Sequence, residues 1–560
     1  MLRLSLAFLA CARTTQAQIA SPLPQANRPN VIIILADDLG YSDLGCFGGE
    51  ARTPNLDALA ADGARFTNFF SESRCCPTRA ALLTGLYPQQ AGVGHMNEKA
   101  SLPAYAGALK PTAPTIAEVL KTAGFRTACF GKWHVSNTLQ RPDHMKDLNR
   151  QRFPEFFSPI EQYPTRRGFD VYWGALWGVV NFYNPFSLVD GERPVTDLPD
   201  NFYITDAINK HAAQFVQQSR GSDQPFFMYI AHNAPHWPLM APAGTIQKYR
   251  NQYTEGYQAT HAARYQRMSD MKIVDPKNTE LSPTIDVAAR DKLSPEEKRF
   301  EAALFQAHAA MIDRMDQGLG KVFQALKEAG KWDNTLIFVL SDNGASPERY
   351  EDAGYDRPSL ARDGKPINYS YKDLTKLAGD EHTFFYIGQH WANVANTPYR
   401  KFKASQYNGG ARTPMIVHWP AGLKVERGGF VRARGHVIDL MATALDIASA
   451  KMPQTFAGQT PHPLQGVSLL PLIQGQSSIE NYPPLFGEHE GGRSVTTPEG
   501  WKLMRDRGEN DWHLYNLNDD ESELHDVIAH NADRAAKMQA MWNRWAEENQ
   551  VLPNHERGTK

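Results

Sequence analysis

Cysteine, net charge and long apolar runs are all scarce in this chain of 560 residues. Its 5 cysteines are too few for a disulfide scaffold in a protein of this length. With 59 Lys+Arg against 61 Asp+Glu, the net charge is -2, so no bulk field attracts nucleic acid or an acidic membrane. No apolar run reaches the ~20 residues of a membrane-spanning helix. We therefore expect no nucleic-acid partner and no integral membrane segment.

Hydrophobic and aromatic residues, by contrast, are present in the proportions of a large folded core. They make up 42% and 11% of the chain, and 21% of the residues are charged. This composition is ordinary for a globular protein and excludes a disordered chain, a coiled coil and a collagen-like rod.

The first 20 residues predict an export signal. Arg3 supplies a positive charge, residues 4–12 form a short apolar stretch, and Thr15-Gln16-Ala17 offers small residues at the cleavage spacing. This pattern predicts an exported protein, periplasmic or extracellular. The sequence Leu9-Ala10-Cys11 leaves a lipoprotein anchor open as an alternative.

Several short apolar runs predict the buried strands of an α/β fold. Residues 31–35 are strongly β-branched, and similar runs occupy residues 226–230, 336–340 and, in shorter form, 414–417. Helical patterns lie between them, including an apolar stripe over residues 300–326. Continuous apolar runs that alternate with helices favour a large mixed, mostly parallel sheet flanked by helices on both faces.

A change of pattern near residue 475 predicts a second, smaller α+β domain. We expect the main domain over residues 29–475 and a C-terminal subdomain over residues 476–560, with a small antiparallel sheet and a terminal helix. The strands of that sheet are expected between residues 500 and 527, and Trp542 and Trp545 lie on one face of the helix.

Chemically active residues follow the predicted strands. They are, in chain order, Asp37-Asp38, Lys132 with His134 (after a shorter run at 127–130), His232 to His236, and Asp342-Asn343. In open α/β sheets, sites form beyond the carboxyl ends of the strands. The sequence therefore predicts one rim that collects acids, an amide, a lysine and histidines.

Three acids at one rim suggest a divalent cation site. Converging carboxylates repel one another unless a cation lies between them, and hard oxygen ligands suit Ca²⁺ or Mg²⁺ better than zinc. Lysine and histidine beside such a site would bind an anion that the cation also holds. Alternatively, the two acidic pairs are separate loop caps, where Asp and Asn are common.

The segment from Ser71 to Gly85 is the most informative. Pro77 and the Ala and Leu residues after it predict a helix, with Cys75 just ahead of its first turn. A helix N-terminus favours anions and lowers a thiol pKa, and Arg79 adds a fixed cation. A vicinal disulfide with Cys76 and a buried structural thiol remain alternatives.

These residues resemble the signatures of the type I sulfatases, and most closely those of bacterial arylsulfatases. The matching strings are Cys75-x-Pro77-Thr78-Arg79-x-x-Leu82-Leu83-Thr84-Gly85, Gly124 to His134, Asp37-Asp38, Asp342-Asn343-Gly344, Ala234-Pro235-His236-Trp237-Pro238, and Pro398 to Lys403 ahead of Gly409 to Pro414. They occur in the family's order between about residues 29 and 430. The resemblance implies an alkaline-phosphatase-like fold and makes residues 29–475 the catalytic domain.

The resemblance also implies the chemistry. In this family, a separate maturation enzyme oxidises the signature cysteine, here Cys75, to the aldehyde formylglycine. Its hydrate is a gem-diol: one hydroxyl attacks sulfur and expels the alcohol, and the other then loses a proton so that sulfate leaves. A covalent step of this kind divides one difficult displacement into two easier ones.

The family roles carry over to matching positions only. Asp37, Asp38, Asp342, Asn343 and modified Cys75 would bind one Ca²⁺, and Arg79 would steady the diol. Lys132, Lys403 and His236 would hold sulfate or the departing oxygen, and His134 would take the proton in the elimination. Lys401 lies two positions from Lys403, so the choice between these lysines stays open.

The leading interpretation is therefore a sulfuric ester hydrolase that acts on aryl or carbohydrate sulfates. A phosphate or phosphonate ester hydrolase of the same superfamily is an alternative, although such sites use Ser or Thr with two zinc ions. A non-catalytic binder of sulfated glycans is a third.

The sequence does not identify the alcohol of the substrate or the oligomeric state. Aromatic-rich segments at 241–298 and 346–395 are expected to shape the leaving-group pocket unless their aromatics are core residues.

Overall fold

A computed structural model describes residues 28–551, except 98, 101, 139–156, 196, 286–290 and 355. The export signal predicted at residues 1–20, and Cys11 with its alternative anchor, lie outside the described residues. Among the helices that are described, none is both long enough and apolar enough to cross a bilayer.

A mixed sheet, eleven-stranded in the described part of the chain, forms the centre of the molecule. Its strands are β1 (Asn30–Ala36), β2 (Ala64–Phe70), β3 (Arg126–Gly131), β4 (Val171–Ala175), β5 (Leu188–Asp190), β6 (Arg193–Pro194), β7 (Phe226–Ala231), β8 (Thr335–Ser341), β9 (Arg412–His418), β10 (Gly429–Val431) and β11 (Gly435–His436). The order is β10-β2-β9-β8-β1-β7-β3-β4-β5-β6, with β11 beside β2. The four strands β8, β1, β7 and β3 are parallel, whereas β9 runs antiparallel to β8 and β2. The predicted mixed, mostly parallel sheet is confirmed.

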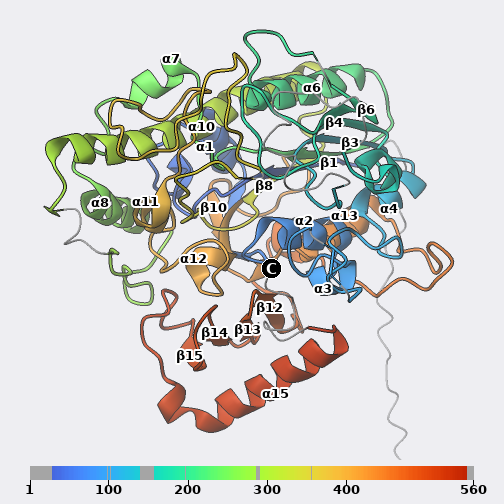
Figure 1. Ribbon diagram of the computed structural model, residues 1–560. Helices are drawn as coiled ribbons and strands as arrows, with labels where there is room; N and C mark the ends of the chain where they lie inside the picture. The colour runs from blue at the N-terminus through green and yellow to red at the C-terminus, as the bar shows by residue number, and fades with distance from the viewer. Residues whose placement is uncertain are drawn as a thin grey trace, which may run out of the picture.

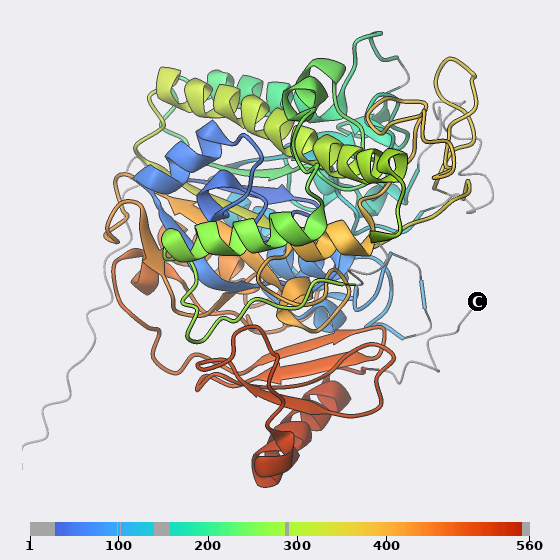
Figure 2. The same cartoon turned by 90° about the vertical axis from the view of Figure 1, so that its left-hand side faces the viewer.

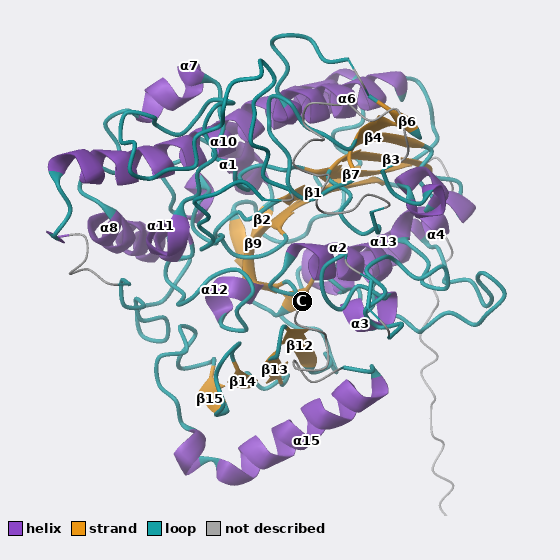
Figure 3. Ribbon diagram, in the orientation of Figure 1, coloured by secondary structure: helices purple, strands orange, loops and turns teal. Residues whose placement is uncertain are grey.

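Helices cover both faces of this sheet (Figure 1, Figure 3). They are α1 (Pro54–Asp62), α2 (Cys75–Thr84), α3 (Pro88–Ala91), α4 (Ile116–Thr122), α6 (Ile204–Gln218), α7 (Ala243–Ile246), α8 (Tyr257–Asp270), α10 (Pro295–Glu328), α11 (Gly388–Ala395), α12 (Asn408–Ala411), α13 (Asp439–Ala448) and α14 (Leu470–Ile473). The group α1, α6 and α10 lies on one face and the group α2, α4 and α13 on the other. Helix α10 contains the predicted apolar stripe, and a capping box of Ser294 and Glu297 starts it.

A second sheet and a terminal helix form a separate layer beneath the main body (Figure 2). The four antiparallel strands are β12 (Leu485–His489), β13 (Gly492–Thr496), β14 (Trp501–Arg505) and β15 (His513–Asn516), and α15 (Ala532–Glu548) packs against them. Trp542 and Trp545 of α15 are buried, as their spacing predicted. The sheet begins before residue 500, where its first strand was expected: the hairpin β12–β13 precedes that residue. Two glycines interrupt the apolar alternation of these strands, and the pattern was therefore missed.

Candidate active site

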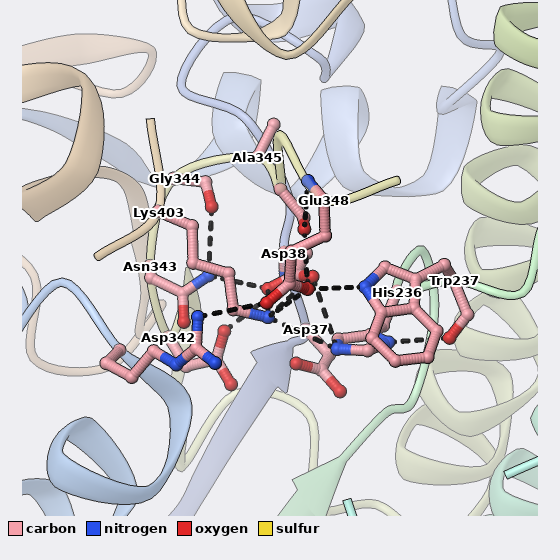
Figure 4. Close-up of polar contacts among 12 residues, drawn as sticks. Asp37, Asp38, His236, Trp237, Asp342, Asn343, Gly344, Ala345, Glu348 and Lys403 are labelled. Atoms are coloured by element: carbon pink, nitrogen blue, oxygen red, sulfur yellow. Dashed lines mark hydrogen bonds and ion pairs between the residues drawn. The ribbon is translucent and has the colours of Figure 1, made fainter. Parts of the chain in front are cut away.

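Four neighbouring parallel strands bring the predicted rim residues to one edge of the sheet. Ala36 of β1 is in register with Ser341 of β8, and Ala231 of β7 is in register with Leu35 and Gly131. The residues that follow these strand ends must therefore be neighbours. Figure 4 shows the result: the acids, His236 and Lys403 point toward one another in a single buried cluster.

The two acidic pairs contact each other directly. The backbone N–H of Asp38 donates to Asp342 Oδ1 (3.2 Å), and Asn343 Nδ2 donates to Asp38 Oδ1 (2.6 Å). Among the described residues, Asp37 Oδ1 and Asn343 Oδ1 are buried and accept no hydrogen bond. Two buried oxygens without donors, beside further carboxylate oxygens, match the ligand set of a hard cation. Because the two pairs contact each other directly, they are not two separate loop caps.

Three buried cations balance the three acids. Lys132 Nζ donates to Asp37 Oδ2 (2.6 Å), Arg79 Nη2 to Asp342 Oδ2 (2.8 Å), and Lys403 Nζ lies 2.8 Å from Asp38 Oδ1. All six side chains are almost fully buried. Burial raises the pKa of Asp37 and of Asp342, although Lys132 and Arg79 oppose it. A cation bound to the acids would release the lysines to hold an anion.

Cys75 lies beside this cluster, at the first residue of α2. The N–H of Thr78 donates to the carbonyl of Arg74 (2.9 Å), so the helix begins at Cys75 itself and not at Pro77 as predicted. Cys75 and Cys76 are both free thiols, which removes the vicinal disulfide. The hydrogen bond with the Cys76 thiol holds the pKa of Cys75 well below its ordinary value; Lys132 and His134 act in the same direction, and burial opposes them.

His134 and His236 lie beside the charged side chains of the cluster. Burial, reinforced by Lys132, lowers the pKa of His134 to about 4, so the imidazole is neutral at physiological pH. His134 Nδ1 has no hydrogen-bond partner among the described residues. His236 Nε2 lies 3.2 Å from Lys403 Nζ and 3.4 Å from Asp38 Oδ2, and burial lowers its pKa to about 3. A buried neutral imidazole can accept a proton during a reaction.

The backbone around these residues is strained. Asp38 and His134 have φ angles of 62° and 56°, and Ser73 and Ala404, which flank Cys75 and Lys403, have 58° and 70°. Left-handed conformations at non-glycine residues cost free energy and cluster at functional sites. The structure also separates the two candidate lysines, because Lys403 is buried in the cluster whereas Lys401 lines an open cavity elsewhere.

Glu348 is part of the cluster but was missed in the sequence. Its carboxylate accepts from Trp237 Nε1 (2.6 Å) and Arg74 Nη1 (3.1 Å) and lies 3.8 Å from Lys403 Nζ. Burial raises its pKa, but Lys403 and Arg74 outweigh burial and hold it well below its ordinary value. Glu348 lies in an irregular stretch after β8, where no strand or helix period signals its position.

Most aromatics of the two long segments are core residues and do not line the site. Trp391, for example, stacks on Phe305 with ring centroids 4.5 Å apart. Tyr350 is an exception, since it is 38% exposed. Its ring lies 6.1 Å from that of Trp237, which in turn lies 4.8 Å from the buried ring of Tyr386. Tyr350 therefore offers an aromatic surface beside Trp237 and His236.

Known proteins are similar to this chain in sequence and in fold. A family model described as Sulfatase matches residues 29–450, and one described as N-sulphoglucosamine sulphohydrolase, C-terminal, matches residues 401–550. The arylsulfatase of Klebsiella aerogenes is 32% identical over 80% of this chain and 92% of its own length. An uncharacterized sulfatase of Schizosaccharomyces pombe is 30% identical over 92% of this chain and 93% of its own length. The crystal structure of Ps i-CgsB in complex with k-i-k-neocarrahexaose is 25% identical, with a TM-score of 0.64 over 93% of both chains.

Proposed function

Because the chain belongs to the sulfatase family of sulfuric ester hydrolases, we propose that it hydrolyses aryl or carbohydrate sulfates at the strand-end cluster. We further propose that Cys75, oxidised to formylglycine by a separate maturation enzyme, is the source of the nucleophile. The position of Cys75 carries this proposal: it starts α2, is buried beside three cations, and lies within 4.8 Å of a ring nitrogen of His134.

A single Ca²⁺ would be held by Asp37, Asp38, Asp342 and Asn343, together with residue 75. The buried oxygens Asp37 Oδ1 and Asn343 Oδ1 support this assignment, because neither accepts a hydrogen bond in the described structure. Bound there, Ca²⁺ would supply positive charge that polarises the sulfate oxygens. All four ligands offer oxygen, which favours Ca²⁺ over zinc.

The remaining residues would bind, orient and move protons. Lys132, Lys403 and His236 would bind the sulfate oxygens and stabilise the charge that develops on the departing oxygen. Arg79, fixed by Asp342, would orient residue 75. Hydrated formylglycine supplies two hydroxyls, one for attack on sulfur and one that must lose its proton. His134 is the base for that proton, since it is neutral and has a free ring nitrogen.

The phosphatase alternative fits the site less well. A second metal would need histidine ligands near the acids, yet Asn343 occupies the position after Asp342, and His236 already contacts Lys403. A non-catalytic glycan binder would be expected to have lost an acid or a cation of the cluster, and none is missing. One similar structure contains k-i-k-neocarrahexaose, which supports including carbohydrate sulfates among the candidate substrates.

Two further proposals concern the whole chain. Residues 29–475 would form the catalytic domain and residues 476–560 the C-terminal subdomain, and the leader at residues 1–20 would direct export to the periplasm or beyond. N-terminal sequencing of the protein recovered outside the cytoplasm tests the leader, because an intact Met1 would contradict cleavage.

A substrate panel tests the proposed activity. Protein produced together with a maturation enzyme is assayed on aryl sulfates, carbohydrate sulfates and the matching phosphate esters. We expect turnover of at least one sulfate with Ca²⁺ present, and phosphate esters to be slower. Hydrolysis confined to phosphate esters, with two zinc ions per chain by metal analysis, would support the phosphatase alternative.

A further inference from the structure

We propose that His95, His489 and Glu490 form a second metal site, of a kind suited to Zn²⁺, where the C-terminal sheet meets the main body. The three residues come from distant parts of the chain. His489 is the last residue of β12, Glu490 lies in the turn before β13, and His95 follows α3 in the main body. In Figure 1, β12 lies beside α3 and slightly below it, and the contact between His95 and Glu490 joins residues 395 positions apart.

The three side chains converge as metal ligands do. His95 Nε2 lies 3.1 Å from Glu490 Oε1, and His489 Nε2 lies 3.8 Å from the same oxygen. The three ligand atoms all lie within 4.8 Å of one another, and the two imidazole rings are nearly parallel, at 15°, with centroids 5.3 Å apart. Tetrahedral Zn²⁺ with bonds of about 2.0–2.1 Å separates its ligands by roughly 3.3 Å. Small side-chain movements would therefore complete the site.

Two of the three side chains are open to solvent. The side chains of His95 and Glu490 are 29% and 22% exposed, so the cluster opens to solvent, whereas His489 is buried. Arg507 pairs with the other oxygen of Glu490, Oε2, and so leaves Oε1 available. An outer partner of this kind orients a carboxylate ligand. Histidine binds a metal in its neutral form, so affinity would rise with pH.

The donor set separates this site from the calcium site. Two imidazoles and one carboxylate, with an open fourth position, are typical of zinc ligation, whereas the side chains proposed to hold Ca²⁺, those of Asp37, Asp38, Asp342 and Asn343, all bind through oxygen. A metal bound here would link the hairpin β12–β13 to the loop after α3. It would stabilise the folded chain by mass action, because the unfolded chain does not hold the three ligands together. This inference does not depend on the proposed sulfatase mechanism.

Cobalt titration of the full chain tests the proposal. The Cys75→Ser variant, kept in excess Ca²⁺, serves as the background, because Cys75, Cys76 and His134 form another candidate cluster. Co²⁺ reports its own ligands by visible absorption, and Zn²⁺ is then added in competition. We expect one Co²⁺ per chain without a thiolate charge-transfer band, displacement by Zn²⁺, and a higher unfolding temperature with Zn²⁺.

Two single variants test the ligands, and a third serves as the control. His95→Ala and the isosteric Glu490→Gln should each weaken binding by at least ~100-fold, beyond the usual effect of an outer partner. His525→Ala is the matched control, because His525 also pairs with a glutamate, Glu280 at 3.0 Å, but is not in a described three-ligand cluster. It should leave binding unchanged. The proposal fails if the background variant binds no Co²⁺, or if natively folded Glu490→Gln binds Co²⁺ as tightly as the background does.

Discussion

At the scale of single residues, the site pairs buried acids with buried cations, and the sequence predicts only some of these residues. Asp37, Asp38 and Asp342 are visible because they follow strands, whereas Glu348 is not. Yet Glu348 lies between Lys403 and Arg74 and receives the indole N–H of Trp237. It therefore connects Arg74, the residue before Cys75, with Lys403 and with the aromatic surface.

Glu348→Gln should impair catalysis without unfolding the protein. The amide keeps the shape of the side chain but removes the charge opposite Lys403 and Arg74. Since hydrogen bonds to charged groups contribute about 1.5–3 kcal/mol, we expect kcat/KM for an aryl sulfate to fall by ~10- to 100-fold. Steady-state kinetics measures this, with Glu351→Gln, an exposed neighbour, as the control. Equal kcat/KM in Glu348→Gln and the parent would show that Glu348 does not orient the site.

His134→Ala should stall the second half of the reaction. Without the proposed base, the variant should release alcohol once per active site and then retain sulfate on residue 75. Mass spectrometry of the quenched enzyme detects the added sulfate on that peptide. Lys132→Ala is the comparison, because it should slow the first step and leave no adduct. Turnover without a burst, with residue 75 free, would assign His134 to sulfate binding.

Gly178→Ala should act through His134. A methyl group at position 178 would lie 2.1 Å from His134 Cε1 and 2.3 Å from Nε2, so the imidazole would have to move. We expect the same burst and adduct as in His134→Ala, with a near-native unfolding temperature. Gly244→Ala, at a glycine with no atoms within 4 Å, is the control. Full steady turnover by Gly178→Ala would mean that the ring position is not critical.

At the scale of elements, the loop after β1 holds Asp37 and Asp38 in place through a buried anchor. Asp43 in this loop accepts from His308 of α10 (2.9 Å) and Arg264 of α8 (2.8 Å) and from the N–H of Gly40 (2.9 Å). His308 is buried within α10. Two helices on the outside of the sheet therefore fix the backbone that carries the acids.

Asp43→Asn should destabilise the fold and change its response to acid. Burial raises the pKa of Asp43, but His308 and Arg264 outweigh burial and hold it below the ordinary 3.8. A depressed pKa contributes stability that is complete above the unfolded-state value and lost as pH falls through the folded-state value. Arg264 keeps its ion pair with Glu50 (2.8 Å), so losing the charged hydrogen bonds of Asp43 should cost about 1.5–3 kcal/mol near neutral pH.

Urea unfolding at several pH values checks this. The difference in unfolding free energy between parent and variant should shrink as pH falls below about 4, because the parent then loses the ionised Asp43. A difference that stays constant down to about pH 2 would exclude a charge effect. Asp270→Asn, an exposed residue at the end of α8, is the control.

At the scale of the whole molecule, the C-terminal sheet supports the segment that follows Lys403. Asp506 accepts from Ser405 Oγ (2.8 Å) and from the N–H of Gln406 (2.9 Å). Glu523, paired with Lys502 of β14 at 2.6 Å, accepts from the N–H of Asn408 (2.6 Å) at the start of α12. The small sheet thus fixes the backbone between Lys403 and β9, which ties it to the geometry of the site.

The sequence predicted the site residues that directly follow a strand. It did not predict those whose position depends only on tertiary contacts. Asp37, Lys132 and Asp342 follow apolar runs, so their meeting at one edge follows from parallel pairing. The start of α2 at Cys75 was misjudged because Pro77, which lacks an N–H, is tolerated within a first turn. Glu348 gives no sequence signal, because its partners are side chains from three separate segments.

The role of residue 75 is tested most directly by measuring sulfate release per chain that carries formylglycine there. Preparations with graded conversion of Cys75 are made by varying the maturation enzyme, and the aldehyde fraction is measured by mass spectrometry of the peptide. The rate with an aryl sulfate should rise in proportion to that fraction and pass through zero at no conversion. A preparation with an unmodified Cys75 thiol that turns over as fast as the converted protein, or aldehyde found at Cys76, would contradict the assignment.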